Sequence, residues 1–395
     1  MDSTGSKHLK TAIAGLAPVA VLIVLVYSFL SGGSSLQLPG AQLPIEELTI
    51  ERIELLPEEI RVHVVNSGPS EVTVAQVLVN EAIWDALASP SNVIPRLGRA
   101  SLSLPFNWVE GEPYEVTLIT SNGFDFSAEV QAAVLTPLPT LDQFVSLAIV
   151  GVYVGVVPVF LGLTWLPFLR RIGVKWFRLF ISLTVGLLIF LGVDALEEAL
   201  NLANLVPGPF QGAILIASGV LISFLALVAV GTTSLGKSAA KEKSLLALAY
   251  LIALGIGLHN LGEGLAIGAA YAVGEVALGT FLILGFTIHN TTEGVAIVAP
   301  ISKRRTPLYH LGLLGVLAGA PTILGAWIGG FIFSPLWAVL FLAIGAGAIF
   351  NVVYDLVGYL SRGKSAIKTF GEPFNLAGLI LGFLVMYTTA LLVPV

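Results

Sequence analysis

Two stretches of this chain repeat one pattern of chemically active side chains. Residues His259–Gly264 (HNLGEG) and His289–Gly294 (HNTTEG) both read H-N-x-x-E-G, and each is followed by a hydrophobic residue, an alanine and an isoleucine. Each copy supplies an imidazole, an amide and a carboxylate within an otherwise apolar stretch. Because ionisable groups in apolar surroundings are costly, they are usually retained for a function. Two matching sets on consecutive helices therefore predict one shared site.

The spacing within each copy favours metal binding. Residues four apart share one face of an α-helix, so His259 points the same way as Glu263, and the second copy repeats the arrangement. Imidazole nitrogens and carboxylate oxygens suit Zn²⁺, Fe²⁺, Mn²⁺ or Co²⁺, and two carboxylates neutralise a divalent charge that hydrocarbon would not tolerate. Two sets can hold one ion or two, and the alternative is a set of hydrogen bonds between helices. The predicted metal ligands are His259, Asn260, Glu263, His289, Asn290 and Glu293.

The composition places this chemistry in a membrane protein. Of the 395 residues, 56% are hydrophobic and 11% are charged, and the mean hydropathy is +0.91. A soluble domain carries about 25% charged residues. The absence of cysteine excludes disulfides and thiolate metal sites, and methionine only at Met1 and Met386 argues against a Cu(I) site. No basic patch indicates a nucleic-acid partner.

Nine apolar segments are long enough to cross a bilayer as helices, which takes about 20 residues. The first follows Lys7 and Lys10, as the apolar part of a signal peptide does. Because its apolar run is as long as a full span, we prefer an uncleaved N-terminal membrane anchor at residues 1–35. The nine predicted segments are residues 11–31, 143–167, 178–200, 210–232, 245–272, 276–300, 309–332, 336–360 and 374–394.

Residues 36–140 follow a different pattern, in which apolar and polar side chains alternate with period two. The run Asn66–Ser70 breaks two alternating segments, and Tyr114–Thr120 with Phe124–Val130 predicts a β-hairpin. Several short strands in about a hundred residues predict a small β-sandwich. The region is acidic, with 14 Asp or Glu residues against four Arg. It contains no chemical motif and is interpreted as a structural or interaction module whose partner is unknown.

The basic residues beside the predicted spans indicate the orientation, because cytoplasmic loops are rich in lysine and arginine. They fall in alternate connections, so all of them lie on one side if the nine segments span. This predicts a multi-pass protein of the cell membrane with a cytoplasmic N-terminus and an extracytoplasmic β domain and C-terminus. The residues are Lys7, Lys10, Arg170, Arg171, Lys175, Arg178, Lys237, Lys241, Lys243, Lys303, Arg304, Arg305, Arg362, Lys364 and Lys368.

Acidic residues lie on both sides of the predicted site. Asp194, Glu197 and Glu198 fall toward the outer end of the third span and form a predicted entry pathway. For the two glutamates, simple solvation at a helix end is the alternative. Asn351 and Asp355 fall toward the cytoplasmic end of the eighth span and form a predicted exit pathway. Acidic groups above and below a central site are what a cation conduit needs.

These residues resemble the motifs of the ZIP family of divalent metal transporters. Its bacterial and archaeal branch carries HNxPEG and HxxPEG, which align with His259–Gly264 and His289–Gly294. The resemblance covers residues 143–395. It implies an all-α polytopic protein whose eight-helix transporter domain, residues 141–395, follows one extra transmembrane helix and an extracytoplasmic β-sandwich. It also implies a metal site between the fourth and fifth core helices, acidic positions on the second and seventh, and a homodimer.

The chain departs from the family pattern at three places. Gly262 and Thr292 replace the motif prolines, and a threonine can bond its own backbone. Thr322 stands where a glutamate is common in the family, which favours one well-formed metal site over two. The loop at residues 236–243 lacks the histidines of many members, so we expect no metal sensor there.

The sequence thus predicts transport of a divalent transition-metal ion, with zinc first and iron, manganese or cobalt as alternatives. Import toward the cytoplasm is what the resemblance implies. The metal is a substrate, the bilayer is the other partner, and no enzymatic activity is predicted. Uptake needs no nucleotide site and no P-loop occurs, and the absence of H-E-x-x-H argues against a hydrolase. An intramembrane metal-dependent hydrolase and a metal sensor without flux remain the alternatives.

Overall fold

A computed structural model describes residues 20–24, 45–136, 138–236, 241–272, 276–332, 334–361 and 364–391. The chain separates into two compact units, Met1–Ile45 and Glu46–Val395. Of the anchor predicted at residues 1–35, only the helical residues Ala20–Val24 are described, and the rest of that prediction lies outside the described residues. The second unit contains a β-sheet domain and, after it, a helical domain.

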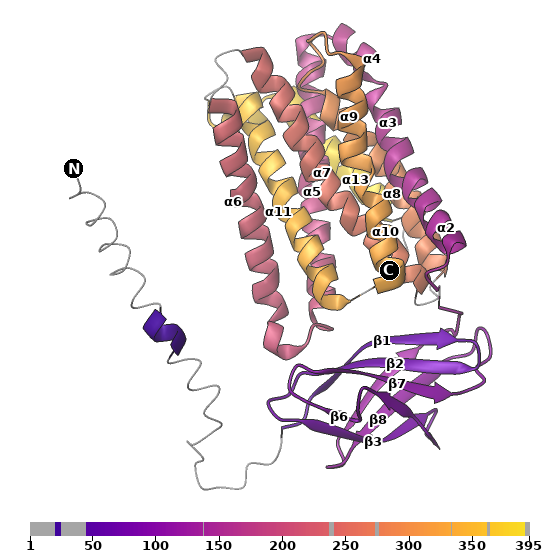
Figure 1. The fold of residues 1–395 in the computed structure, drawn as a ribbon. Helices are drawn as coiled ribbons and strands as arrows, with labels where there is room; N and C mark the ends of the chain where they lie inside the picture. The colour runs from indigo at the N-terminus through magenta and orange to yellow at the C-terminus, as the bar shows by residue number, and fades with distance from the viewer. Residues whose placement is uncertain are drawn as a thin grey trace, which may run out of the picture. The chain divides into compact units, whose positions relative to one another are not determined.

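The β-sheet domain consists of two antiparallel sheets (Figure 1). One has the strand order β1-β2-β7-β5, and the other has the order β4-β3-β8-β9, with β6 paired to β3. The strands are β1 (Leu48–Leu56), β2 (Glu59–Asn66), β3 (Val72–Val79), β4 (Ala82–Trp84), β5 (Leu87–Ser89), β6 (Val93–Ile94), β7 (Arg99–Pro105), β8 (Tyr114–Thr120) and β9 (Asp125–Val130).

The period-two alternation of the sequence builds the core of this domain. Alternate residues of β2, such as Val62 and Val64, are fully buried, as are Val116 and Leu118 of β8. Side chains from both sheets join one hydrophobic cluster, which is the packing of a sandwich. The predicted hairpin is confirmed, because β8 pairs with β9 in antiparallel register.

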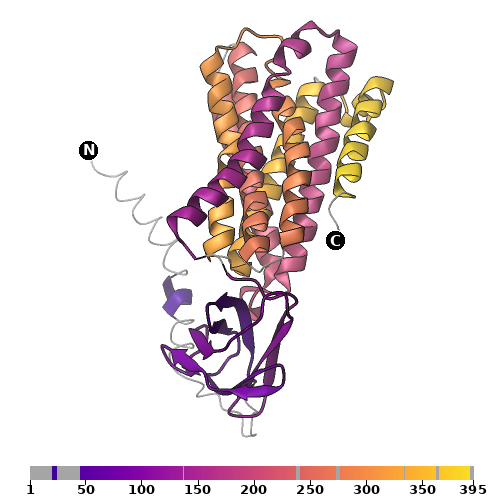
Figure 2. The same ribbon diagram turned by 90° about the vertical axis from the view of Figure 1, so that its right-hand side faces the viewer.

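The helical domain confirms eight of the nine predicted membrane segments, since eight helices in the described residues are long and apolar enough to span (Figures 1 and 2). Its elements are α2 (Leu141–Gly151), η1 (Val152–Val156), α3 (Val157–Leu163), α4 (Leu166–Arg171), α5 (Val174–Ala203), η2 (Gly208–Phe210), α6 (Gly212–Gly236), α7 (Lys241–Ala272), α8 (Val276–Val298), α9 (Leu308–Gly319), α10 (Pro321–Ile332), α11 (Pro335–Ser361), α12 (Ala366–Phe370) and α13 (Pro373–Ala390).

Two of the spans are interrupted, which the segment prediction did not include. In the span Leu141–Arg171, the π-helical turn η1 separates α2 from α3, and Pro158 lies in the first turn of α3. The span Leu308–Ile332 breaks at Ala320, directly before Pro321. Proline has no backbone N–H, so it cannot complete the helical hydrogen-bond ladder. Both interruptions therefore free backbone carbonyl groups for other donors.

Helix α7 occupies the centre of the helical domain. It packs against α8, α9, α10 and α11. In its most apolar stretch 61% of the residues are buried, against 22% in the span Gly208–Gly231, which lies largely in α6. At the other side of the bundle α13 packs along α5 (Figure 2). The first H-N-x-x-E-G motif therefore lies on α7, which shares with α11 the largest buried fraction among the described spans, 61%.

Candidate metal centre

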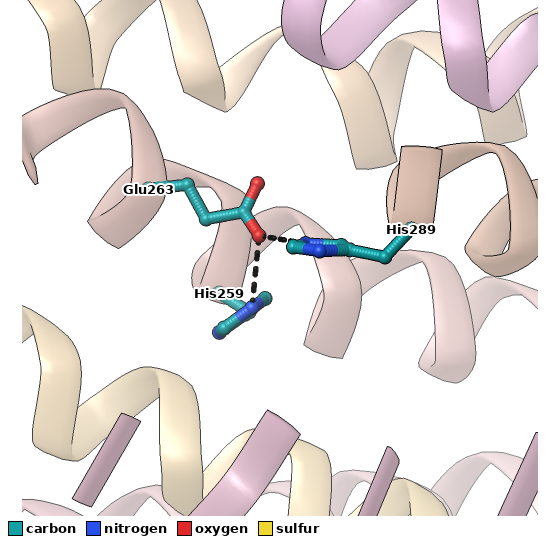
Figure 3. A group of neighbouring side chains, drawn as sticks. All are labelled: His259, Glu263 and His289. Atoms are coloured by element: carbon teal, nitrogen blue, oxygen red, sulfur yellow. Dashed lines mark hydrogen bonds and ion pairs between the residues drawn. The ribbon is translucent and has the colours of Figure 1, made fainter. Parts of the chain in front are cut away.

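The two motifs meet where α7 packs against α8. His259 and Glu263 of α7 and His289 of α8 each direct one ligand atom to a common point, and these three atoms lie within 4.8 Å of one another (Figure 3). The exposed fraction of each of the three residues is 5% or less. The structure thus brings together three of the six predicted ligands from both copies of the motif.

One oxygen atom of Glu263 joins the two imidazoles. His289 donates a hydrogen bond from Nε2 to Glu263 Oε1, and Nε2 of His259 lies 3.1 Å from the same oxygen. The two imidazole planes are tilted by 40°, with ring centroids 6.5 Å apart. Zn²⁺ is bound by histidine nitrogen and carboxylate oxygen at about 2.0–2.2 Å, and these converging atoms are of that kind.

The other oxygen of Glu263 is held by the second motif. Asn290 donates from Nδ2 to Glu263 Oε2 at 2.9 Å and to the carbonyl oxygen of Val154 at 3.0 Å. Asn260 donates from Nδ2 to the carbonyl oxygen of Ala318 at 3.0 Å. The amide nitrogens therefore face backbone and carboxylate acceptors, and both asparagine oxygens lack a hydrogen-bond partner among the described residues.

Glu293 lies outside the group of three ligand atoms but is equally enclosed. It is 2% exposed, and neither of its carboxylate oxygens has a hydrogen-bond partner in the described part of the chain. A buried carboxylate without donors is costly unless a cation or proton compensates it. Glu293 is therefore a second buried acidic group, which lies on α8 one turn after His289 and is not among the three converging ligands.

The last residue of each motif explains how the helices come so close. A Cβ atom at Gly264 would collide with the carbonyl group of Thr322 in α10, and one at Gly294 would collide with that of Val159 in α3. Small residues allow the backbones of membrane helices to approach closely. The glycines thus set the two motifs against the two interrupted spans.

The positions that lack the motif prolines are regular helix. Gly262 lies inside the continuous helix α7, where the nearest neighbour of an added Cβ would be the side chain of Leu342. Thr292 donates from Oγ1 to the carbonyl oxygen of His289 at 2.6 Å, as predicted for a threonine bonded to its own backbone. Thr322 is fully buried, and its Oγ1 has no hydrogen-bond partner in the described chain.

The predicted entry residues lie on α5. Asp194, Glu197 and Glu198 are all exposed on the surface of the helical domain. Asp194 is near enough to interact electrostatically with His259 and His289. Of the three predicted entry residues, Asp194 is therefore the one whose charge acts on the histidines.

The predicted exit residues lie on α11. Asn351 is 1% exposed, and neither atom of its amide has a hydrogen-bond partner in the described residues, whereas Asp355 is half-buried one turn away. Helix α11 also reaches the metal centre, because Gly345 packs against the backbone of His259.

Sequence reasoning missed the backbone partners of the two asparagines. The signal available for them was the pair of prolines, Pro158 and Pro321, within apolar spans.

Comparison with known proteins adds no constraint on this site: no protein-family model matches the chain, and no curated protein matches its sequence.

Proposed function

We propose that this protein transports divalent transition-metal ions across a membrane, with zinc as the first candidate substrate and iron, manganese or cobalt as alternatives. The observation that carries the proposal is the cluster of His259, Glu263 and His289, buried in the centre of a helical domain of membrane-spanning character. The proposed direction is import toward the cytoplasm, as in the ZIP family that the two motifs resemble.

The chemistry of the cluster supports a transition metal as substrate. Two imidazole nitrogens and a carboxylate oxygen form a borderline donor set, which binds Zn²⁺, Fe²⁺, Mn²⁺ or Co²⁺ better than hard Ca²⁺ or soft Cu⁺. Glu293 is a second buried acidic group, and its oxygens have no hydrogen-bond partner in the described part of the chain. A divalent cation would balance Glu263 and Glu293 together, and this balance supports binding without requiring a second metal.

The proposed mechanism is a hand-off between three groups of side chains. Asp194 and its neighbouring glutamates attract the ion to the bundle, and the charge of Asp194 acts on the two histidines. The cluster then replaces the water of the ion with nitrogen and oxygen ligands. Asp355 receives the ion on the side of the cluster opposite Asp194, and Asn351 lies between the cluster and Asp355 along this proposed path.

A metal-dependent hydrolase is the second candidate, and one observation favours it. Three protein ligands beside a free carboxylate are also the parts of a catalytic zinc site, in which the fourth position holds water and the carboxylate acts as base. His259, Glu263 and His289 would be the ligands, and Glu293 the base. This reading assigns no role to Asp355, and it predicts no metal flux.

The deciding experiment is metal uptake into proteoliposomes that contain the full chain. Zn²⁺, Fe²⁺, Mn²⁺ and Co²⁺ are supplied outside in turn, and a fluorescent chelator reports arrival inside. The wild type is compared with His289→Ala and with His310→Ala, whose ring bonds Tyr250 and not the cluster. We expect uptake by the wild type and His310→Ala only. Uptake no faster than in protein-free vesicles, for all four metals, would exclude transport and leave the hydrolase and the sensor.

A further inference from the structure

Both motif asparagines donate to the backbone of an interrupted span. Asn290 bonds the carbonyl oxygen of Val154 in η1, and Asn260 bonds that of Ala318, two residues before the break at Ala320. Both asparagines are fully buried. Since a carbonyl group only accepts hydrogen bonds, the amide nitrogen of each side chain must face the interruption. The orientation of both amides is thereby fixed.

A proline explains why one of these two carbonyl groups, that of Val154, needs a donor. In an α-helix the carbonyl of Val154 would accept a bond from the N–H four residues later, but that residue is Pro158, which has none. Pro321 removes the donor for Leu317, but Asn260 bonds the next carbonyl along the chain, that of Ala318, and Thr322, four residues after Ala318, keeps its N–H. Asn290 supplies the missing N–H to Val154 directly.

The second N–H of Asn290 reaches the metal centre. It donates to Glu263 Oε2 at 2.9 Å, while Oε1 of the same carboxylate faces the two histidines. Asn290 thus connects the carbonyl of Val154 to the ligand that joins both motifs. Groups that hold the remote atom of a metal ligand orient that ligand and tune its affinity.

We propose that Asn260 and Asn290 are positioning residues: their amide N–H groups hold the two motifs against the interrupted spans, and Asn290 also orients Glu263 for the metal. In each motif the histidine and the asparagine then have different roles. The histidine faces the other motif, and the asparagine, about 100° further round the helix, faces the interruption. The role toward the metal rests on the proposed function, whereas the role toward the backbone does not.

The backbone role is tested by a double-mutant cycle on the purified full chain without metal. Pro158→Ala returns a backbone N–H to the carbonyl of Val154. Asn290→Ala should lower the melting temperature by several degrees in the wild type, as loss of a buried hydrogen bond does, and by clearly less in the Pro158→Ala background. Equal losses in both backgrounds would overturn the backbone role, because independent sites are additive.

The role toward the metal is tested by titrating Zn²⁺ against a fluorescent chelator with Asn290→Asp and Asn260→Asp. Aspartate keeps the size of asparagine but loses its N–H donors. A positioning role predicts zinc affinity weaker by about 10- to 100-fold for Asn290→Asp, as for other groups behind a metal ligand, and a smaller loss for Asn260→Asp. If either asparagine were a direct ligand, the added charge would tighten zinc binding, and that result would overturn the proposal.

Asn375→Asp is the matched control for these variants. Asn375 is also buried and donates from Nδ2 to a backbone carbonyl, that of Thr369. Its variant should lower the melting temperature and leave zinc affinity unchanged. An equal loss of affinity in this control would show that any damaged asparagine weakens binding, which contradicts a positioning role. Absence of zinc binding by the wild type would reject the proposed function, while the melting cycle would still decide the backbone role.

Discussion

Glu263 on α7 accepts a hydrogen bond from His289 on α8, although the two residues are 26 positions apart in the chain. The oxygen that accepts this bond also lies 3.1 Å from Nε2 of His259. One carboxylate oxygen therefore joins the two copies of the motif (Figure 3). The copies form a single site, and the removal of Glu263 should disable both at once.

Replacing Glu293 with glutamine should raise the stability of the metal-free protein and weaken its metal binding. Its two buried oxygens have no hydrogen-bond partner in the described part of the chain, so the ionised carboxylate destabilises the metal-free fold. Glu293→Gln keeps the shape and removes the charge. We expect a higher melting temperature without metal and a smaller rise in melting temperature when Zn²⁺ is added, since a ligand stabilises by its affinity for the folded state. A variant that melts lower without metal, or keeps the full zinc-induced rise, would contradict this account of Glu293.

The close contact at Gly264 predicts a loss of stability when a methyl group is added. A Cβ there meets the backbone carbonyl of Thr322, which cannot move aside as a flexible side chain would. Gly264→Ala should destabilise the protein by about 1–3 kcal/mol, as overpacking does, in thermal unfolding of the purified chain. Gly312→Ala, in α9, is the matched control, because nothing lies within 4 Å of a Cβ added at Gly312. Helix propensity alone should stabilise the control by up to about 1 kcal/mol, and a similar loss in both variants would refute the contact.

The β domain should lose stability in acid through Glu54. The pKa of this carboxyl lies below its ordinary value of 4.5, first because of its interaction with His63 and then because of the charges of Arg52 and Arg61, which together outweigh burial. Because the folded pKa is lowered, the stabilisation is complete above pH 4.5, the ordinary and hence unfolded value, and is lost as the pH falls through the folded pKa.

Hydrogen exchange of β1 and β2 in the full chain measures this effect. Wild type and Glu54→Gln are compared at each pH, so that the intrinsic exchange rates cancel. The wild type should be better protected at pH 7, and the difference should shrink below about pH 4.5, the ordinary carboxyl pKa. A difference that stays constant across this range would rule out ionised Glu54 as its source.

Hydropathy and alternation predicted much of the fold because they report burial directly. The apolar runs marked the helices, and the polar residues between alternating segments marked the turn after Asn66 and the hairpin of β8 and β9. An apolar run, however, contains no information on the regularity of its hydrogen bonds. The π-helical turn η1 and the break at Ala320 were therefore not predicted, although Pro158 and Pro321 are their local causes.

The candidate site was predicted as a set of residues, but its geometry was not. Helical spacing puts His289 and Glu293 on one face of α8, yet the rotation of α8 about its axis decides which of them meets α7. In the structure His289 bonds Glu263, and Glu293 lies outside the group of converging ligand atoms. That rotation depends on tight contacts such as Gly294 against Val159, which a single sequence does not reveal.

The most direct test of the central claim is the initial rate of Zn²⁺ uptake into proteoliposomes by Glu263→Gln. Glu110→Gln, in an exposed turn of the β domain, is the control for the same chemical change. The amounts of protein in the vesicles are matched. The account predicts a wild-type rate for Glu110→Gln and a rate lower by about 100-fold for Glu263→Gln, the upper end of the loss seen when even an outer-shell partner is removed. Equal uptake by Glu263→Gln and the wild type would contradict transport through this site.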